Sequence, residues 1–122
     1  MSTIYLPDGR RIADRAIWAG LGRLPNPKTD VPTIIVEFVS KRQRDRVRDY
    51  EEKRREYLAL GVSEYWIFDR FRRILTAYLK PPAEPAEQVI EGEGTDRTPL
   101  LPGFELALAR IWRVADDWKH PR

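Results

Sequence analysis

One acidic residue stands out because it lies where a charge is least expected. The segment from Thr33 to Val39 reads Thr-Ile-Ile-Val-Glu-Phe-Val, and Glu37 is its only ionisable side chain. An apolar run this rich in β-branched residues is typical of a strand in the middle of a sheet. An isolated ionised carboxylate there is very unfavourable, so Glu37 must be paired, protonated or bound to a metal ion. A core-facing arginine at the end of the sheet is the alternative to a metal.

Asp14 is the second candidate for chemistry. It lies in the second strand of a predicted hairpin, Ile4–Leu6 and Arg11–Trp18, whose turn is Pro-Asp-Gly. Strand alternation would then place Asp14 on the same face as Ile12, Ala16 and Trp18. Two carboxylates that converge from neighbouring strands form a site of hard oxygen ligands, suited to Mg²⁺ or Mn²⁺. Taken alone, Asp14 is equally typical of a turn or a sheet edge.

A basic residue facing these carboxylates is the third candidate. Lys53 and Arg54 both fall within the apolar arc of a predicted helix, so helical periodicity does not choose between them. A lysine at such a site can orient a water molecule or neutralise charge that develops on a phosphate. Its alternative role is to lay its aliphatic stem along the core edge and keep its charge in water.

A βαβ unit would position these groups. Strand 33–39, helix 46–60 and strand 64–68 are long enough for parallel strands joined by a right-handed crossover. Gly61 stands where the helix is expected to stop. Further strands are predicted over residues 74–79, 88–91 and 104–108. The architecture predicted from these patterns is a mixed sheet with one principal helix.

Composition limits the other possibilities. A chain of 122 residues predicts one domain, residues 1–122, and the absence of cysteine excludes disulfides, thiolate metal sites and cysteine catalysis. No run approaches the roughly 18 apolar residues of a membrane span, so we expect a cytoplasmic protein. Residues 41–55 hold eight basic and four acidic groups, and this excess exceeds the net charge of +3. The segment is either a solvated helix face or a contact for nucleic-acid phosphates, made by Lys41, Arg42, Arg44, Arg46 and Arg48.

Taken together, these segments resemble a known family. The stretch from Pro32 to Asp69, which contains RDYEEKRREY in the helix and GVSEYWIFD in the following strand, closely resembles the Uma2 family. That family belongs to the PD-(D/E)xK nuclease superfamily. LPDGRRIADRAIW, from Leu6 to Trp18, is similar to the family's hairpin with its motif aspartate. LLPGFEL, from Leu100 to Leu106, is similar to its closing segment.

The resemblance implies an α/β fold, a restriction endonuclease-like mixed β-sheet with one principal helix, shortened at its N-terminus. By the same resemblance, Asp14 and Glu37 would be the metal-binding acids. Val39 occupies the usual place of the superfamily's lysine, and the family's lysine on the following helix would be Lys53. The implied function is a metal-dependent endonuclease that hydrolyses phosphodiester bonds in DNA and uses Mg²⁺ or Mn²⁺. A symmetric homodimer is the default expectation for its assembly.

An alternative function stays open at this point. Thr33 stands where relatives usually carry an aspartate, Val39 replaces the usual lysine, and the chain begins close to the motif hairpin. A protein that keeps the nuclease fold without cleavage would serve as a nucleic-acid-binding or oligomeric interaction module. Binding of a divalent metal ion distinguishes the two functions.

Overall fold

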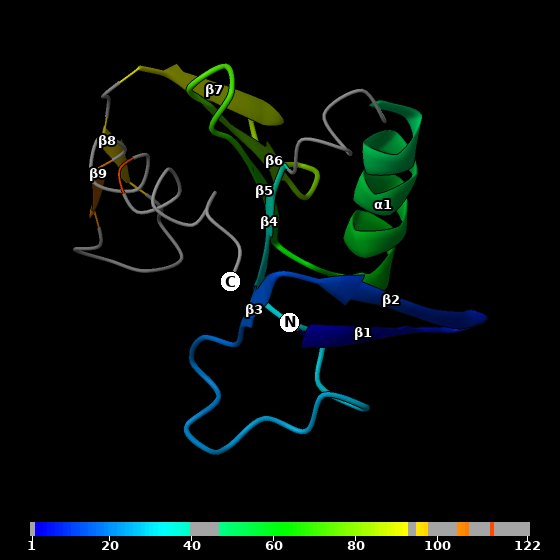
Figure 1. Cartoon of the computed structure of the whole chain (residues 1–122). Helices are drawn as coiled ribbons and strands as arrows, with labels where there is room; N and C mark the ends of the chain where they lie inside the picture. The colour runs from blue at the N-terminus through cyan, green and yellow to red at the C-terminus, as the bar shows by residue number, and fades with distance from the viewer. Residues whose placement is uncertain (1, 40–46, 93–94, 98–104, 108–112, 114–122) are drawn as a thin grey trace, which may run out of the picture.

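A five-stranded mixed sheet forms the centre of the molecule, and one helix stands against it. The computed structural model describes residues 2–39, 47–92, 95–97, 105–107 and 113. The sheet has the strand order β3-β4-β5-β6-β7, and a hairpin, β1–β2, runs beside one end of the helix (Figure 1). The elements are β1 Ser2–Leu6, β2 Gly9–Ala13, β3 Arg15–Ile17, β4 Ile34–Phe38, α1 Val47–Leu60, β5 Glu64–Asp69, β6 Ile74–Leu79, β7 Glu87–Glu91, β8 Thr95–Arg97 and β9 Glu105–Ala107.

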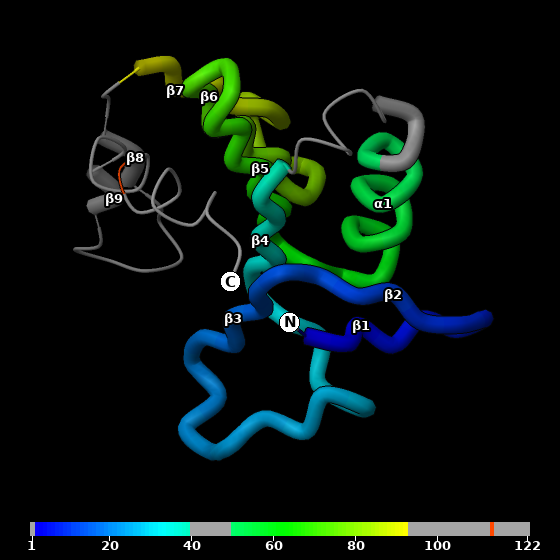
Figure 2. Tube along the Cα trace, viewed as in Figure 1, coloured from blue at the N-terminus to red at the C-terminus, as the bar shows by residue number. Residues whose placement is uncertain are grey.

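The predicted βαβ unit is confirmed. Strands β4 and β5 pair in parallel, with Glu37 level with Ile67, and α1 lies between them in the chain. Figure 2 shows α1 alongside the sheet and the chain returning from its end into β5. The helix ends at Leu60, and Gly61 follows with a φ of 113°. This backbone conformation is one that glycine adopts readily and other residues rarely do, so Gly61 explains where the helix stops.

The two faces of the sheet carry two apolar clusters. On the face toward α1, Ile35 and Tyr65 pack with Tyr57 of the helix and with Ile4 of the hairpin, all buried. On the other face, side chains of β4, β5 and β6 pack together: Ile34, Val36, Trp66, Phe68, Leu75 and Ala77. Burial of an isoleucine or leucine side chain stabilises a fold by about 2 kcal/mol. Strand β4 contributes to both clusters, as its apolar sequence predicts.

The hairpin differs from the prediction at its second strand. Strands β1 and β2 pair antiparallel as expected, but the strand predicted over Arg11–Trp18 is interrupted at Asp14. The part before Asp14 pairs with β1, and the part after it, β3, joins the five-stranded sheet. The shared face predicted for Ile12 and Asp14 is therefore wrong: Ile12 is 59% exposed, whereas its neighbour Ala13 is buried. The reason is long-range, because the Asp14 carboxylate accepts a hydrogen bond from the backbone of Phe38.

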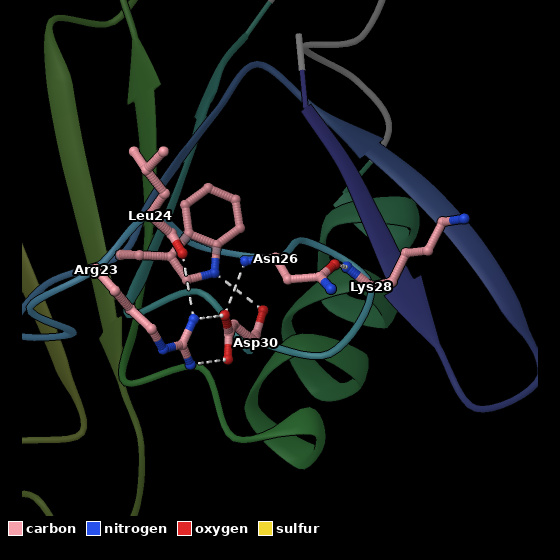
Figure 3. A network of polar contacts seen from close by, with 6 residues as sticks. Arg23, Leu24, Asn26, Lys28 and Asp30 are labelled. Atoms are coloured by element: carbon pink, nitrogen blue, oxygen red, sulfur yellow. Dashed lines mark hydrogen bonds and ion pairs between the residues drawn. The ribbon is translucent and has the colours of Figure 1, made fainter.

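A polar network organises the connection between β3 and β4 (Figure 3). Arg23 donates two hydrogen bonds to the carboxylate of Asp30, at 2.7 and 2.8 Å, and the backbone N–H of Asn26 donates a third at 2.8 Å. These hydrogen bonds, with Arg23 the larger cause, hold the pKa of Asp30 at about 2. The indole N–H of Trp18 donates to the carbonyl of Asp30. The loop is thereby tied to the end of β3 before the chain enters β4.

The remaining strands follow the prediction closely. Strand β6 has the predicted bounds, and β7 is an edge strand that begins one residue earlier than expected. The strand predicted over residues 104–108 is observed as β9, which pairs with β8, a strand that the sequence did not predict. No helix in the described part of the chain is long and apolar enough to cross a membrane.

Candidate functional site

Glu37 is buried, and both of its carboxylate oxygens are engaged. Glu37 is 5% exposed and lies in β4, a strand with a neighbour on each side in the sheet. Oε1 accepts a hydrogen bond from the ammonium of Lys53 at 3.1 Å, and Oε2 accepts one from the hydroxyl of Tyr65. Among the described residues, the cation that pairs with Glu37 is therefore a lysine and not the arginine considered as an alternative. An ammonium and a phenol together satisfy a charge that would otherwise be very unfavourable in this position.

The structure separates the two basic residues that helical periodicity left equivalent. Lys53 extends from α1 to Glu37, and its side chain is only 12% exposed. Its ammonium lies 5.7 Å from the centre of the Tyr50 ring. The guanidinium of Arg54 instead lies over the ring of Tyr78, at 4.7 Å. Lys53 is thus the residue that faces the buried carboxylate, and Arg54 covers the neighbouring part of the sheet.

Tyr65 is a further member of this cluster, although its position in the apolar sequence of β5 predicts only a core residue. Its ring is fully buried, edge-on to Tyr57 at 5.2 Å and stacked with Tyr78 at 6.3 Å. Burial, and next the charge of Glu37, raise the pKa of Tyr65, so its hydroxyl stays protonated and donates. A signal was available: in the parallel register Tyr65 pairs with Ile35, which shares a strand face with Glu37.

Asp14 reaches the same region from the bend between β2 and β3. Its Oδ2 accepts a hydrogen bond of 2.7 Å from the backbone N–H of Phe38. Arg15 pairs with Val36, and this antiparallel register, continued by one residue, brings Asp14 level with Glu37. Asp14 is therefore joined to the cluster through the backbone that follows Glu37. Among the described residues, none donates a hydrogen bond to its other oxygen, Oδ1.

The donor set suits a small divalent cation held partly by its substrate. Mg²⁺ prefers oxygen ligands and is commonly bound by one or two carboxylates, with waters and phosphate oxygens completing its shell. Asp14, in the bend before β3, and Glu37, in the neighbouring strand β4, supply two carboxylates. Within the described residues, no group of three or more acids or histidines is placed to hold a metal ion. The carboxylates of Asp14 and Glu37 therefore fit Mg²⁺ as two of its ligands, and substrate oxygens and water would complete the shell.

A cavity of about 210 Å³ adjoins this cluster. It is bounded by Tyr50 and Arg54 of α1, by Val39, which follows β4, and by Ile67 of β5 and Tyr78 of β6. Tyr50 contacts Lys53, and Ile67 is the register partner of Glu37. The cavity is therefore lined by neighbours of the ion pair, and neither Glu37 nor Lys53 lines it.

The predicted phosphate contacts fall largely outside the described residues. Lys41, Arg42, Arg44 and Arg46 all lie there. Arg48 lies in the first turn of α1, and the structure describes its backbone. The role of these five residues stays a prediction, and so do the catalytic and metal-binding roles of Asp14, Glu37 and Lys53.

The mixed sheet, the parallel βαβ unit and the single helix of the described residues define an α/β domain, and the comparisons that follow relate it to the restriction endonuclease-like class. The sequence model of the family described as "Uma2: Putative restriction endonuclease" matches residues 2–109. The chain therefore belongs to the Uma2 family.

A solved structure shows the same fold. It is the crystal structure of a "putative nuclease belonging to DUF820 from Anabaena variabilis ATCC 29413", with a TM-score of 0.68 and 15% sequence identity. The alignment covers 91% of this chain and 64% of that chain, so this chain spans less than two thirds of the neighbour's length. A comparison with curated proteins gives no match.

Proposed function

We propose that this protein is a metal-dependent endonuclease that hydrolyses phosphodiester bonds in DNA, with Mg²⁺ or Mn²⁺ as its cofactor. The observation that carries the proposal is the contact of 3.1 Å between the Lys53 ammonium and the buried Glu37 carboxylate, beside Asp14. Membership of the family described as "Putative restriction endonuclease" supports the nuclease part of the proposal. We include in the proposal a symmetric homodimer, the commonest assembly of soluble oligomers.

Asp14 and Glu37 are the proposed metal ligands. A divalent ion at such a site lowers the pKa of a bound water and stabilises negative charge on the scissile phosphate. The two carboxylates bring two negative charges, of which the Lys53 ammonium balances one. The remaining negative charge favours a cation over an anion at this edge of the sheet.

Lys53 is the proposed positioning group for the attacking water. The oxygen of that water would form a bond to phosphorus and release one proton to solvent, the bond from phosphorus to the leaving oxygen would break, and the leaving oxygen would take up a proton from solvent. Negative charge increases on the phosphate oxygens during this step, and a nearby ammonium stabilises it. Because Lys53 is held in a mostly buried position, its charge is screened less by water than that of a surface lysine.

The basic residues that precede and begin α1 are the proposed contacts for the DNA backbone. Arginine and lysine contacts to phosphates hold a duplex in place without reading its sequence, and they weaken steeply as salt is added. The residues that would make these phosphate contacts are Lys41, Arg42, Arg44, Arg46 and Arg48.

A titration with Mn²⁺ followed by a plasmid cleavage assay tests the proposal. The informative variant is Glu37→Gln, which removes the charge and keeps the shape. The matched control is Glu64→Gln, because Glu64 is a buried carboxylate of the same sheet that bonds to Trp66. We expect wild type and the control to bind Mn²⁺ in calorimetry and to nick supercoiled plasmid only with metal, and Glu37→Gln to do neither.

Two outcomes would refute the proposal. Equal Mn²⁺ affinity in wild type and Glu37→Gln would show that Glu37 is not a ligand. A plasmid left intact by the metal-loaded wild type would show a nuclease fold without cleavage. Light scattering of the same samples tests the dimer, since a monomer at micromolar concentration contradicts that part.

A further inference from the structure

We infer that Tyr65 is a positioning residue for Glu37, a role that rests on the proposed function of Glu37 as a metal ligand. In this inference the Tyr65 hydroxyl holds Oε2 of the carboxylate, so that Oε1 is the oxygen presented to a cation. The starting observation is the hydrogen bond from the Tyr65 hydroxyl to Oε2 inside the core.

The packing around Tyr65 leaves its hydroxyl little freedom. The ring is fully buried, with the Tyr57 ring against it edge-on and the Tyr78 ring stacked on it. A side chain enclosed in this way cannot change rotamer without opening the core. The hydroxyl therefore donates to Glu37 from a fixed direction.

The partner of the other oxygen is held differently. Oε1 accepts from Lys53, whose ammonium is carried by a flexible four-carbon stem on a side chain that is 12% exposed. An ammonium on such a stem can move aside and let another cation take its place on Oε1. The Tyr65 hydroxyl cannot move aside in this way. The two oxygens of Glu37 therefore differ: Oε2 keeps its Tyr65 partner, whereas Oε1 can exchange Lys53 for another cation.

This inequality has a consequence for metal binding. Residues that hydrogen-bond a ligating carboxylate set its orientation, and replacing them typically weakens metal affinity about 10- to 100-fold. Without the Tyr65 hydroxyl, the Glu37 carboxylate would lose its fixed bond and would rotate toward Lys53, its remaining partner. Lys53 would then compete more strongly with a metal ion.

The test compares Tyr65→Phe with Tyr78→Phe. Tyr78 is the cross-strand partner of Tyr65 and stacks on it, but its hydroxyl interacts with Glu87 and Arg54 and not with Glu37. Each variant removes one phenol oxygen from the same region of the sheet. We expect calorimetry to show Mn²⁺ binding weakened about 10-fold or more in Tyr65→Phe and within about twofold of wild type in Tyr78→Phe.

A crystal structure of metal-free Tyr65→Phe supplies a second readout. We expect the Glu37 carboxylate to have turned away from the position that it occupies beside Tyr65 in the wild type. If wild type binds Mn²⁺, an unchanged affinity in Tyr65→Phe, or an equal loss in Tyr78→Phe, overturns the inference. If wild type binds no Mn²⁺, the proposed function fails, and the carboxylate position alone decides whether Tyr65 positions Glu37.

Discussion

Replacing Lys53 by methionine tests how strongly the buried ion pair holds Glu37 in place. The substitution keeps an unbranched side chain of similar length and removes the charge. Glu37 would then be a buried carboxylate with Tyr65 as its remaining partner. Breaking a buried ion pair from one side destabilises a protein by about 3–5 kcal/mol, and the retained hydrogen bond offsets about 1 kcal/mol of this. We therefore expect the free energy of unfolding to fall by about 2–4 kcal/mol.

Urea unfolding at neutral pH measures the change, with Arg55→Met as the matched control. Arg55 is the exposed residue two positions beyond Lys53 in the same helix. Arginine, lysine and methionine have similar helix propensities, so the control isolates burial of the charge from helix formation. Surface substitutions of this kind usually change stability by less than about 0.5 kcal/mol.

The double variant that combines Lys53→Met with Glu37→Gln tests whether the two charges are coupled. With both charges removed, the amide at position 37 can still bond to the Tyr65 hydroxyl, and no buried charge is left without a partner. The double variant should therefore be more stable than Lys53→Met alone. A loss in Lys53→Met no larger than in Arg55→Met would refute the view that Lys53 stabilises the buried carboxylate of Glu37. Additive effects of the two substitutions would refute their coupling.

Two further predictions concern the frame around the site. Gly61→Ala should destabilise the fold by about 1–3 kcal/mol in urea unfolding, because a φ of 113° strains any residue with a Cβ. The nearest atom to that Cβ is Val31 Cγ1 at 3.9 Å, so a change below about 0.5 kcal/mol would contradict a backbone cause. In Arg23→Gln, the pKa of Asp30 should rise from about 2 toward its usual value, as a carbon-13 NMR titration would measure. The lowered pKa contributes stability above about pH 4 that is lost as the pH falls toward 2, and an unchanged pKa would contradict the assignment to Arg23.

The sequence could predict the parts of the fold that depend on local patterns. The β-branched run around Glu37 predicted β4, and the glycine after Leu60 predicted the end of α1; both were confirmed. Glu37 was identifiable as a site residue because a charge within such a run conflicts with its surroundings. Each of these signals lies within a few residues of the position that it explains.

The parts that escaped prediction depend on contacts between distant segments. The bend at Asp14 is held by a bond to Phe38, which lies 24 residues further along the chain. The choice between Lys53 and Arg54 depends on where the helix stands over the sheet, and periodicity places both in the same arc. Tyr65 follows the pattern of a core residue, and only its contact with Glu37 distinguishes its hydroxyl.

The same long-range contacts explain why the candidate site and the hairpin are connected. Arg11 of β2 donates to Glu56 of α1 at 2.5 Å and lies 3.9 Å from Glu52. Arg11 precedes Asp14 by three residues, and Glu56 follows Lys53 by three, so this contact ties the strand that leads to one site residue to the helix that carries another. A partly exposed ion pair contributes no more than about 1 kcal/mol to stability. Its main effect is therefore to connect β2, which leads to Asp14, with α1, which carries Lys53.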